Sequence, residues 1–131
     1  MQRFLIVAGV LLATGAYAHA DGDPAAGEKV FRKCQACHMV GPDAKNRVGP
    51  VLNGIVGNNW GTVEGFKYSA SLVEGAEAGR VWDAETLDAF LTKPRDVVPK
   101  TKMAFAGLRK EKDRTDMIAY LAQFAPDGST Q

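Results

Sequence analysis

The stretch Cys34-Gln35-Ala36-Cys37-His38 places two cysteines and a histidine within five neighbouring positions. The chain of 131 residues contains no other cysteine, and its only other histidine is His19. Two thiols are too few for a disulfide scaffold, or for a zinc or iron–sulfur site made of thiolates alone. The chemistry of this stretch therefore has to come from the two thiols and the imidazole acting together.

The spacing of these residues matches C-x-x-C-H, the attachment motif of c-type haem. Residues i and i+3 lie on one side of a helical turn, so the thiols of Cys34 and Cys37 can reach the two vinyl groups on one edge of a porphyrin and add across them to form thioethers. The imidazole of His38 can then place a nitrogen on the iron. The sequence thus predicts one covalently attached haem c, with its iron, per chain.

The first twenty residues have the pattern of a secretory signal peptide. A basic start, Met1–Arg3, precedes an apolar run at 4–12 and the small residues of Ala18-His19-Ala20. The run is much shorter than the roughly 20 apolar residues that a membrane-spanning helix needs. We expect cleavage near Ala20, with a site after Ala18 as the alternative, and a periplasmic location.

The remaining chain has the composition of one small folded domain. Removal of residues 1–20 takes away Arg3 and no acidic residue, so basic and acidic side chains become equal at 15 each. This balance argues against nucleic-acid binding, which calls for a strongly basic surface. The hydrophobic fraction of 46% argues against disorder. We expect a single domain at 21–126 and a short mobile tail at 127–131.

The regular elements expected in this domain are helices, which makes the fold class all-α. Asp23 can cap a helix that opens at Pro24, and Asp83 can cap another that Pro94 ends. A shorter helix is possible around 69–74, and Asp113 can cap a last helix that ends before Pro126. Three or four helices joined by long loops bury little apolar surface for about 110 residues. A bound group would fill the middle.

A second axial ligand to the iron would have to be a methionine, because no histidine besides His38 remains after cleavage. Met39 adjoins His38 and cannot reach the opposite face of the ring. Met117 falls in the apolar stripe of the last expected helix, where methionine ordinarily packs in the core. Met103 lies in an irregular stretch, 98–105, and is the favoured ligand.

Over residues 21–125 the chain resembles the class I cytochromes c, especially the bacterial cytochromes c2 and their mitochondrial relatives. The resemblance rests on the haem motif and on four further segments: Asn46-Arg47-Val48-Gly49-Pro50, Gly65-Phe66-Lys67-Tyr68, Val81-Trp82-Asp83 and Thr101-Lys102-Met103-Ala104-Phe105. It implies a cytochrome c fold wrapped around the haem. It also places Gly27, Phe31 and Tyr120 where the family packs its first helix against its last.

The resemblance implies a role for several side chains around the haem. The Pro50 carbonyl would accept a hydrogen bond from the His38 ring, which fixes the orientation of this ligand. Tyr68 and Trp82 would bond a haem propionate, and Thr101 and Met103 would belong to the methionine-ligand loop. Without the resemblance, the preferred interpretation of Tyr68 and Trp82 is that they are ordinary core residues with a polar tip.

Three positions depart from the family pattern. Lys100 stands where relatives often have glycine, and Asn58 where many place an arginine close to a propionate. Phe90 stands where many carry a tyrosine near the methionine sulfur. We expect the missing hydroxyl to leave the Met103 sulfur a better donor, which favours ferric iron and lowers the reduction potential.

With both axial positions filled, the expected function is one-electron transfer, and the protein is not expected to be an enzyme. Similar cytochromes pass electrons from a bc1-type complex to a terminal oxidase or a photosynthetic reaction centre. Basic residues near the haem segments predict transient electrostatic docking to such membrane complexes: Arg32, Lys33, Lys45, Arg47, Lys93, Arg95, Lys100 and Lys102. We expect a monomer with no small-molecule substrate.

Two alternatives rest on the thiols alone. An exported thiol-disulfide oxidoreductase would use Cys34 as nucleophile and Cys37 as the resolving thiol, but that chemistry usually accompanies a βαβ pattern, which is absent from the sequence. A small binding module could close the pair into a disulfide, although so short a loop would stabilise the fold little.

Overall fold

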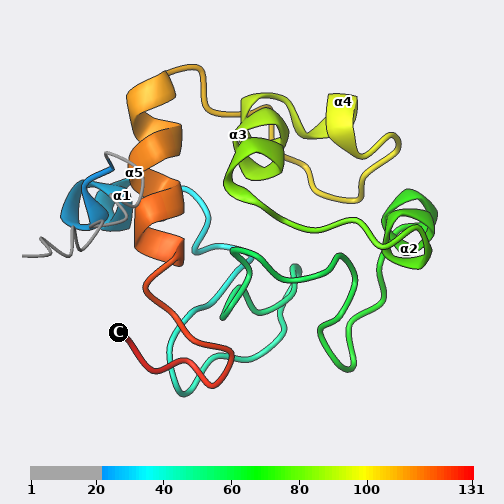
Figure 1. Cartoon of the computed structure of the whole chain (residues 1–131), viewed down its shortest axis with the longest axis horizontal. Helices are drawn as coiled ribbons and strands as arrows, with labels where there is room; N and C mark the ends of the chain where they lie inside the picture. Colours follow the sequence, from blue (N-terminus) through cyan, green and yellow to red (C-terminus); the bar gives the residue numbers. More distant parts are fainter. Residues whose placement is uncertain (1–21) are drawn as a thin grey trace, which may run out of the picture.

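The computed structural model describes residues 22–131, so the expected signal peptide and its cleavage site lie outside the described residues. The described helices are α1 (Pro24–Phe31), α2 (Ala70–Glu77), α3 (Ala84–Thr92), α4 (Pro94–Val97) and α5 (Glu111–Leu121). Extended segments within this range meet only at two isolated bridges, Asn59 with Val81 and Phe124 with Thr130. None of these helices is both long and apolar enough to cross a membrane. The all-α class is confirmed (Figure 1).

Side chains at three helix starts satisfy backbone N–H groups, two of them, Asp23 and Asp83, as the sequence predicts. The Asp23 carboxylate accepts from the Ala25 amide at 2.9 Å, and Pro24 opens α1. The Asp83 carboxylate accepts from the Thr86 amide at 2.7 Å at the start of α3. At α2 the Ser69 hydroxyl accepts more weakly, at 3.4 Å, and the helix extends beyond the expected 69–74.

The last helix begins earlier than predicted. Asp113 does not cap it, because α5 starts at Glu111 after Lys110, whose side chain makes no capping hydrogen bond. Glu111 and Asp113 both lie in the first turn, where negative charge is favoured by the helix dipole. An acidic residue near a helix start can either cap the helix or lie in its first turn, so the sequence pattern alone misplaced the boundary by three residues.

The first and last helices cross in close contact (Figure 1). Gly27 allows this approach, because a Cβ there would clash with the Asp116 carbonyl oxygen on α5. Beside it the rings of Phe31 and Tyr120 lie 5.4 Å apart. The Asp116 carboxylate, on a buried side chain, accepts from the Asp23 amide at 2.8 Å. These contacts confirm the expected packing of Gly27, Phe31 and Tyr120.

The remaining helices surround the interior more loosely. Arg114 of α5 pairs with Asp88 of α3 at 2.7 Å, and α3 also contacts α4. Within residues 22–131, α2 contacts no other helix, and its Gly75 packs against the indole of Trp60. Long loops therefore supply much of the wall around the interior.

Residues 127–131, expected to be mobile, fold back on the preceding chain. The Asp127 carboxylate accepts from the Ser129 amide at 2.9 Å, which is the local bonding that aspartate provides in turns. The Ala125 amide donates to the Ser129 carbonyl at 2.9 Å, and the Gln131 amide donates to the Gln123 carbonyl at 3.0 Å. Local turn chemistry thus gives this polar segment hydrogen-bond partners, and its mobility stays a prediction.

The crossing of α1 and α5 predicts a large cost for Gly27→Ala. The new methyl group has no room beside the Asp116 carbonyl, and overpacking of this kind costs about 1–3 kcal/mol. We expect urea unfolding of the haem-loaded protein to show a free energy lower by that amount. Lys29→Ala, an exposed change on the same helix, should stay within about 0.5 kcal/mol of the original protein. An unchanged or higher stability for Gly27→Ala would contradict this packing.

Candidate functional site

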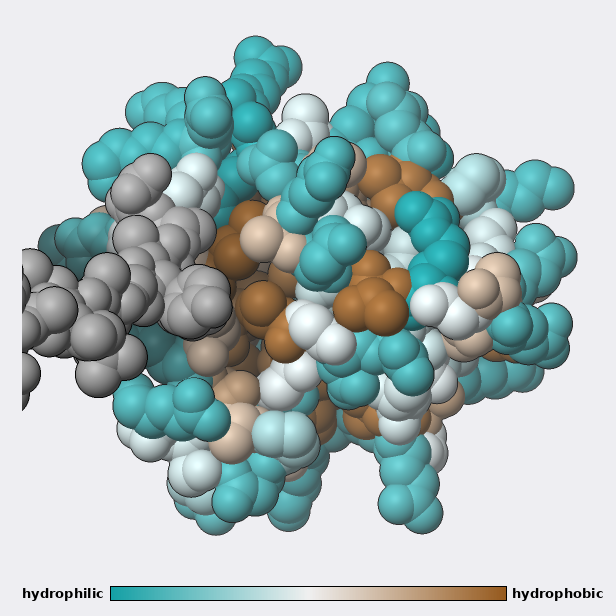
Figure 2. Space-filling view, in the orientation of Figure 1, coloured by the Kyte–Doolittle hydropathy of each residue, from teal (hydrophilic) through white to brown (hydrophobic). Residues whose placement is uncertain are grey.

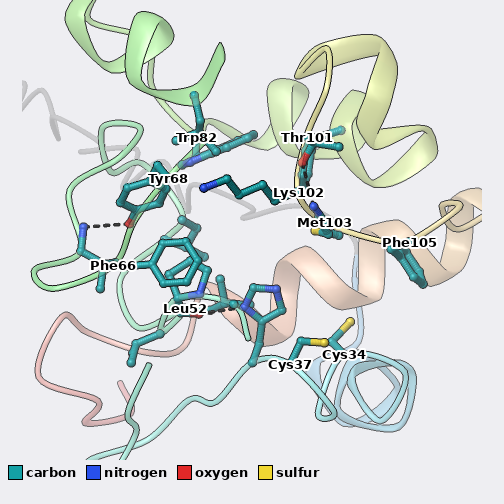
Figure 3. A pocket seen from close by; sticks show the side chains of 18 of the residues that line it. Cys34, Cys37, Leu52, Phe66, Tyr68, Trp82, Thr101, Lys102, Met103 and Phe105 are labelled. Carbon is teal, nitrogen blue, oxygen red and sulfur yellow. Dashed lines mark hydrogen bonds between the residues drawn. The ribbon is translucent and has the colours of Figure 1, made fainter. Parts of the chain in front are cut away.

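A cavity of about 270 Å³ lies between the loops and the helices. All eight site residues predicted from the sequence line it: Cys34, Cys37, His38, Pro50, Tyr68, Trp82, Thr101 and Met103. They come from segments far apart in the chain and converge on one space (Figure 3). Figure 2 shows that hydrophobic surface gathers in the middle of one face and that hydrophilic side chains surround it.

The two cysteines lie on a helical turn that follows α1. The amides of Cys37 and His38 both donate to the Cys34 carbonyl, at 3.1 and 2.9 Å. This turn brings the Cys34 and Cys37 side chains to one end of the cavity, whereas Trp82 and Tyr68 lie at the other end (Figure 3). Burial raises the pKa of the Cys34 thiol, and Lys33 offsets this only in part.

The imidazole of His38 is held by the loop that runs to Pro50. Its Nδ1 lies 2.8 Å from the Pro50 carbonyl oxygen, which can only accept, so Nδ1 carries the proton. Burial lowers the pKa of His38, which favours the neutral ring. Gly49 makes room for this ring, since a Cβ there would clash with it, and its amide donates to the Cys37 carbonyl at 2.9 Å. The Nε2 lone pair is left free to bind a metal ion.

Met103 lies on the loop that follows α4. Its amide donates to the Thr101 hydroxyl at 3.2 Å, which ties this loop together locally. Lys100, in the same loop, has a φ of +57°, a left-handed conformation that favours glycine. This backbone requirement explains physically why glycine suits the position.

The other two methionines are placed differently. Met117 also lines the cavity, but it is 1% exposed and belongs to the core cluster on α5. Met39 does not line the cavity. The structure therefore brings Met103 and Met117 to the same space, and the expectation that Met103 is the ligand stays a prediction.

At the far end of the cavity, Tyr68 and Trp82 present polar groups. The Tyr68 hydroxyl accepts from the Val63 amide at 2.9 Å and keeps its own hydrogen for another partner. Burial raises the pKa of Tyr68, so the hydroxyl stays protonated. Trp82 contacts Phe90, with ring centroids 4.9 Å apart. Asn58 donates to the Thr62 hydroxyl at 3.0 Å.

Sequence reasoning missed most of the apolar wall. These residues lie on loops and helices alike and include Leu52, Ile55, Leu72, Leu87 and Phe105. Their only signal is hydrophobicity, which an ordinary core residue shows equally. It also missed Trp60, which is buried behind Trp82 and carries no motif.

The residues around the cavity fit a haem. Two thiols at one end can form thioethers, and an imidazole nitrogen oriented by a carbonyl can bind the iron. Apolar side chains suit the flat macrocycle, and the polar groups at the opposite end suit its propionates. In residues 22–131 no group of three or more His, Cys, Asp or Glu side chains could hold a bare metal ion instead.

Comparisons with known proteins give one consistent result. Cytochrome c2 of Rhodomicrobium vannielii is 48% identical over 118 residues, which are 90% of this chain and 92% of the relative. Cytochrome c-550 of Ancylobacter novellus is 52% identical over 81% of this chain and 99% of its own length. The solved structure of cytochrome c2 from Rhodospirillum centenum matches with a TM-score of 0.75 and 46% identity, over 80% of this chain and all of that one. No protein-family model matches the chain.

The left-handed backbone at Lys100 predicts that Lys100→Gly stabilises the protein. Relief of the strain, about 1–2 kcal/mol, exceeds the conformational entropy that glycine loses on folding, about 0.5–1 kcal/mol. Thermal or urea unfolding should show a gain of about 0.5–1 kcal/mol. Lys100→Ala is the matched control, because it removes the same charge but keeps the strain. Equal stability of the two variants would refute the strain at this position.

Proposed function

Because this chain belongs to the cytochrome c2 family of class I cytochromes c, we propose that it carries electrons in the periplasm, from a bc1-type complex to a terminal oxidase or a photosynthetic reaction centre. Membership of the family makes the protein an electron carrier with one covalent haem c, and not an enzyme. The observation that supports the proposed haem site and its ligands is the convergence of the eight predicted site residues on one cavity.

Cys34, Cys37 and His38 would hold the group at one end of the cavity. The thiols would form the two thioethers, and His38 would bind the iron through Nε2 while Nδ1 donates to the Pro50 carbonyl. When bound, the haem supplies one-electron cycling between ferrous and ferric iron. The carbonyl of Pro50 then keeps the imidazole oriented in both oxidation states.

Met103 would provide a second protein ligand to the iron. With both His38 and Met103 bound, the iron would transfer electrons without binding oxygen or a substrate, which suits a carrier. The apolar walls would favour the less charged ferrous state and raise the reduction potential. Phe90 offers no hydroxyl to the Met103 sulfur, which would lower the potential relative to a tyrosine at the same position.

The rim of the cavity supports a docking role. The exposed Lys33 and Lys102 line the cavity, and so does Val48, which is 78% exposed. Positive charge around an apolar contact would steer the protein as a monomer to acidic partners in short, salt-sensitive encounters. Such encounters need little buried area.

The thiol-disulfide alternative is wrong. The chain belongs to a family of electron carriers. A nucleophilic cysteine also needs a lowered pKa, whereas burial raises the pKa of Cys34. The βαβ pattern that usually accompanies this chemistry is absent from residues 22–131, where the only β pairing is two isolated bridges.

The covalent attachment predicts a characteristic absorption spectrum. Protein expressed with the haem-attachment machinery should show a c-type α band on reduction, and the colour should remain with the polypeptide after acid extraction. Replacing both Cys34 and Cys37 by serine should let acid remove the haem. A stably folded, colourless protein with free or mutually bridged thiols would end the proposal.

Met103→Leu and Met117→Leu separate the two methionines that line the cavity. Leucine keeps the volume and removes the sulfur, so Met117→Leu should lose less than about 1.5 kcal/mol of stability, whereas Met103→Leu should lose more because it also removes the bond to the iron. The weak red absorption band of methionine-bound ferric iron should disappear in Met103→Leu and persist in Met117→Leu. The opposite pattern would make Met117 the ligand.

A further inference from the structure

The indole of Trp60 lies in a layered arrangement of side chains behind the cavity. Trp60 is 1% exposed, and its ring lies 4.5 Å from that of Trp82 at an interplanar angle of 21°. The Arg80 guanidinium lies 4.0 Å from the centre of the Trp60 ring. Since Trp82 occupies one face of Trp60, the guanidinium covers the other. Trp60 itself does not line the cavity, whereas Trp82 does.

The backbone around this stack fixes the register of the two tryptophans. The Trp60 amide donates to the Arg80 carbonyl at 2.9 Å, and the Trp82 amide donates to the Asn58 carbonyl at 2.8 Å. Gly75 on α2 closes the space around Trp60, since a Cβ there would clash with the six-membered ring of the indole. The Trp60 ring therefore cannot move without displacing Trp82 or α2.

The indole N–H of Trp60 has no hydrogen-bond partner although it is buried. A buried donor without a partner is unfavourable and calls for an explanation. Leucine or phenylalanine would fill the interior without this penalty. What an indole adds at this position is a broad flat face that covers the ring of Trp82.

We infer that Trp60 is a positioning residue for Trp82, whose indole it holds at the far end of the cavity, facing the place of a haem propionate. The inference rests on the proposed roles of the haem and of Trp82. Trp82 is stacked on Trp60 and tilted against Phe90, with ring centroids 4.5 and 4.9 Å away. Only Trp60 offers it a nearly parallel face, so Trp60 sets the plane of its ring.

The first test uses the indole N–H of Trp82. The chain has only two tryptophans, so in any Trp60 variant the single remaining indole signal in a ¹⁵N–¹H spectrum belongs to Trp82. In the ferrous haem-loaded protein, Trp60→Leu should speed hydrogen exchange at this N–H by about 3- to 10-fold, the equivalent of one aromatic pair. Trp60→Phe, which keeps an aromatic face, should exchange more slowly than Trp60→Leu. Equal rates in Trp60→Leu and the original protein would overturn the inference.

The second test measures the reduction potential in a double-mutant cycle. Trp60→Leu should shift the reduction potential in the same direction as Trp82→Phe. The double variant should show little further shift, because both changes act through the same side chain, Trp82. Ile118→Val, a core change on α5, should lower stability without moving the potential. If Trp60→Leu does not change the reduction potential, or if its change adds fully to that of Trp82→Phe, Trp60 is only a packing residue and the inference is wrong.

Gly75→Ala tests the same idea without altering either tryptophan. Its methyl group should displace the Trp60 ring and shift the reduction potential in the same direction as Trp60→Leu does. Gly75→Ala therefore still tests the inference if Trp60→Leu does not fold. Glu74→Ala, exposed on the same helix, should leave the potential unchanged. A potential unmoved by Gly75→Ala would contradict the inference. Failure of the proposed function can be distinguished from failure of this inference, because in the first case the original protein would lack the c-type absorption spectrum.

Discussion

A central cavity that the polypeptide does not fill is the constraint on which the rest of the structure depends. Among the described helices, only α1 and α5 pack closely, and α2 reaches no other helix. Loops close the remaining wall, and side chains from both ends of the domain face the same space (Figure 3). A flat apolar group therefore completes the core as well as supplying the redox chemistry. Stability and function share one set of contacts in this protein.

The contacts around the cavity act through backbone geometry more than through side-chain charge. The Pro50 carbonyl orients the His38 ring, and Gly49 leaves the room that the ring needs. The Thr101 hydroxyl ties down the loop of Met103, while Lys100 takes a left-handed conformation to let that loop turn. Such constraints would hold both proposed ligands, His38 and Met103, in nearly fixed positions. A carrier benefits, because little has to rearrange when an electron arrives or leaves.

The two ends of the cavity have different tasks. At the cysteine end, Lys33 and the exposed Val48 leave the site accessible to partners. At the opposite end Trp82 is nearly covered, and Trp60 and Phe90 pack around it. Under the proposed function, electrons would be exchanged at the cysteine end, and polar groups would be buried at the other end.

The sequence by itself determined the parts that depend on neighbouring residues. The C-x-x-C-H spacing predicts the haem, and Asp23 and Asp83 predict two helix starts, because capping and helical turns are local. Asp113 misled the prediction of α5, since local rules allow it either role. Only the tertiary structure brought Met117 to the same cavity as Met103 and stacked Trp60 on Trp82. Contacts between distant segments leave no spacing to read, because hydrophobic packing is not directional and many residues satisfy it equally.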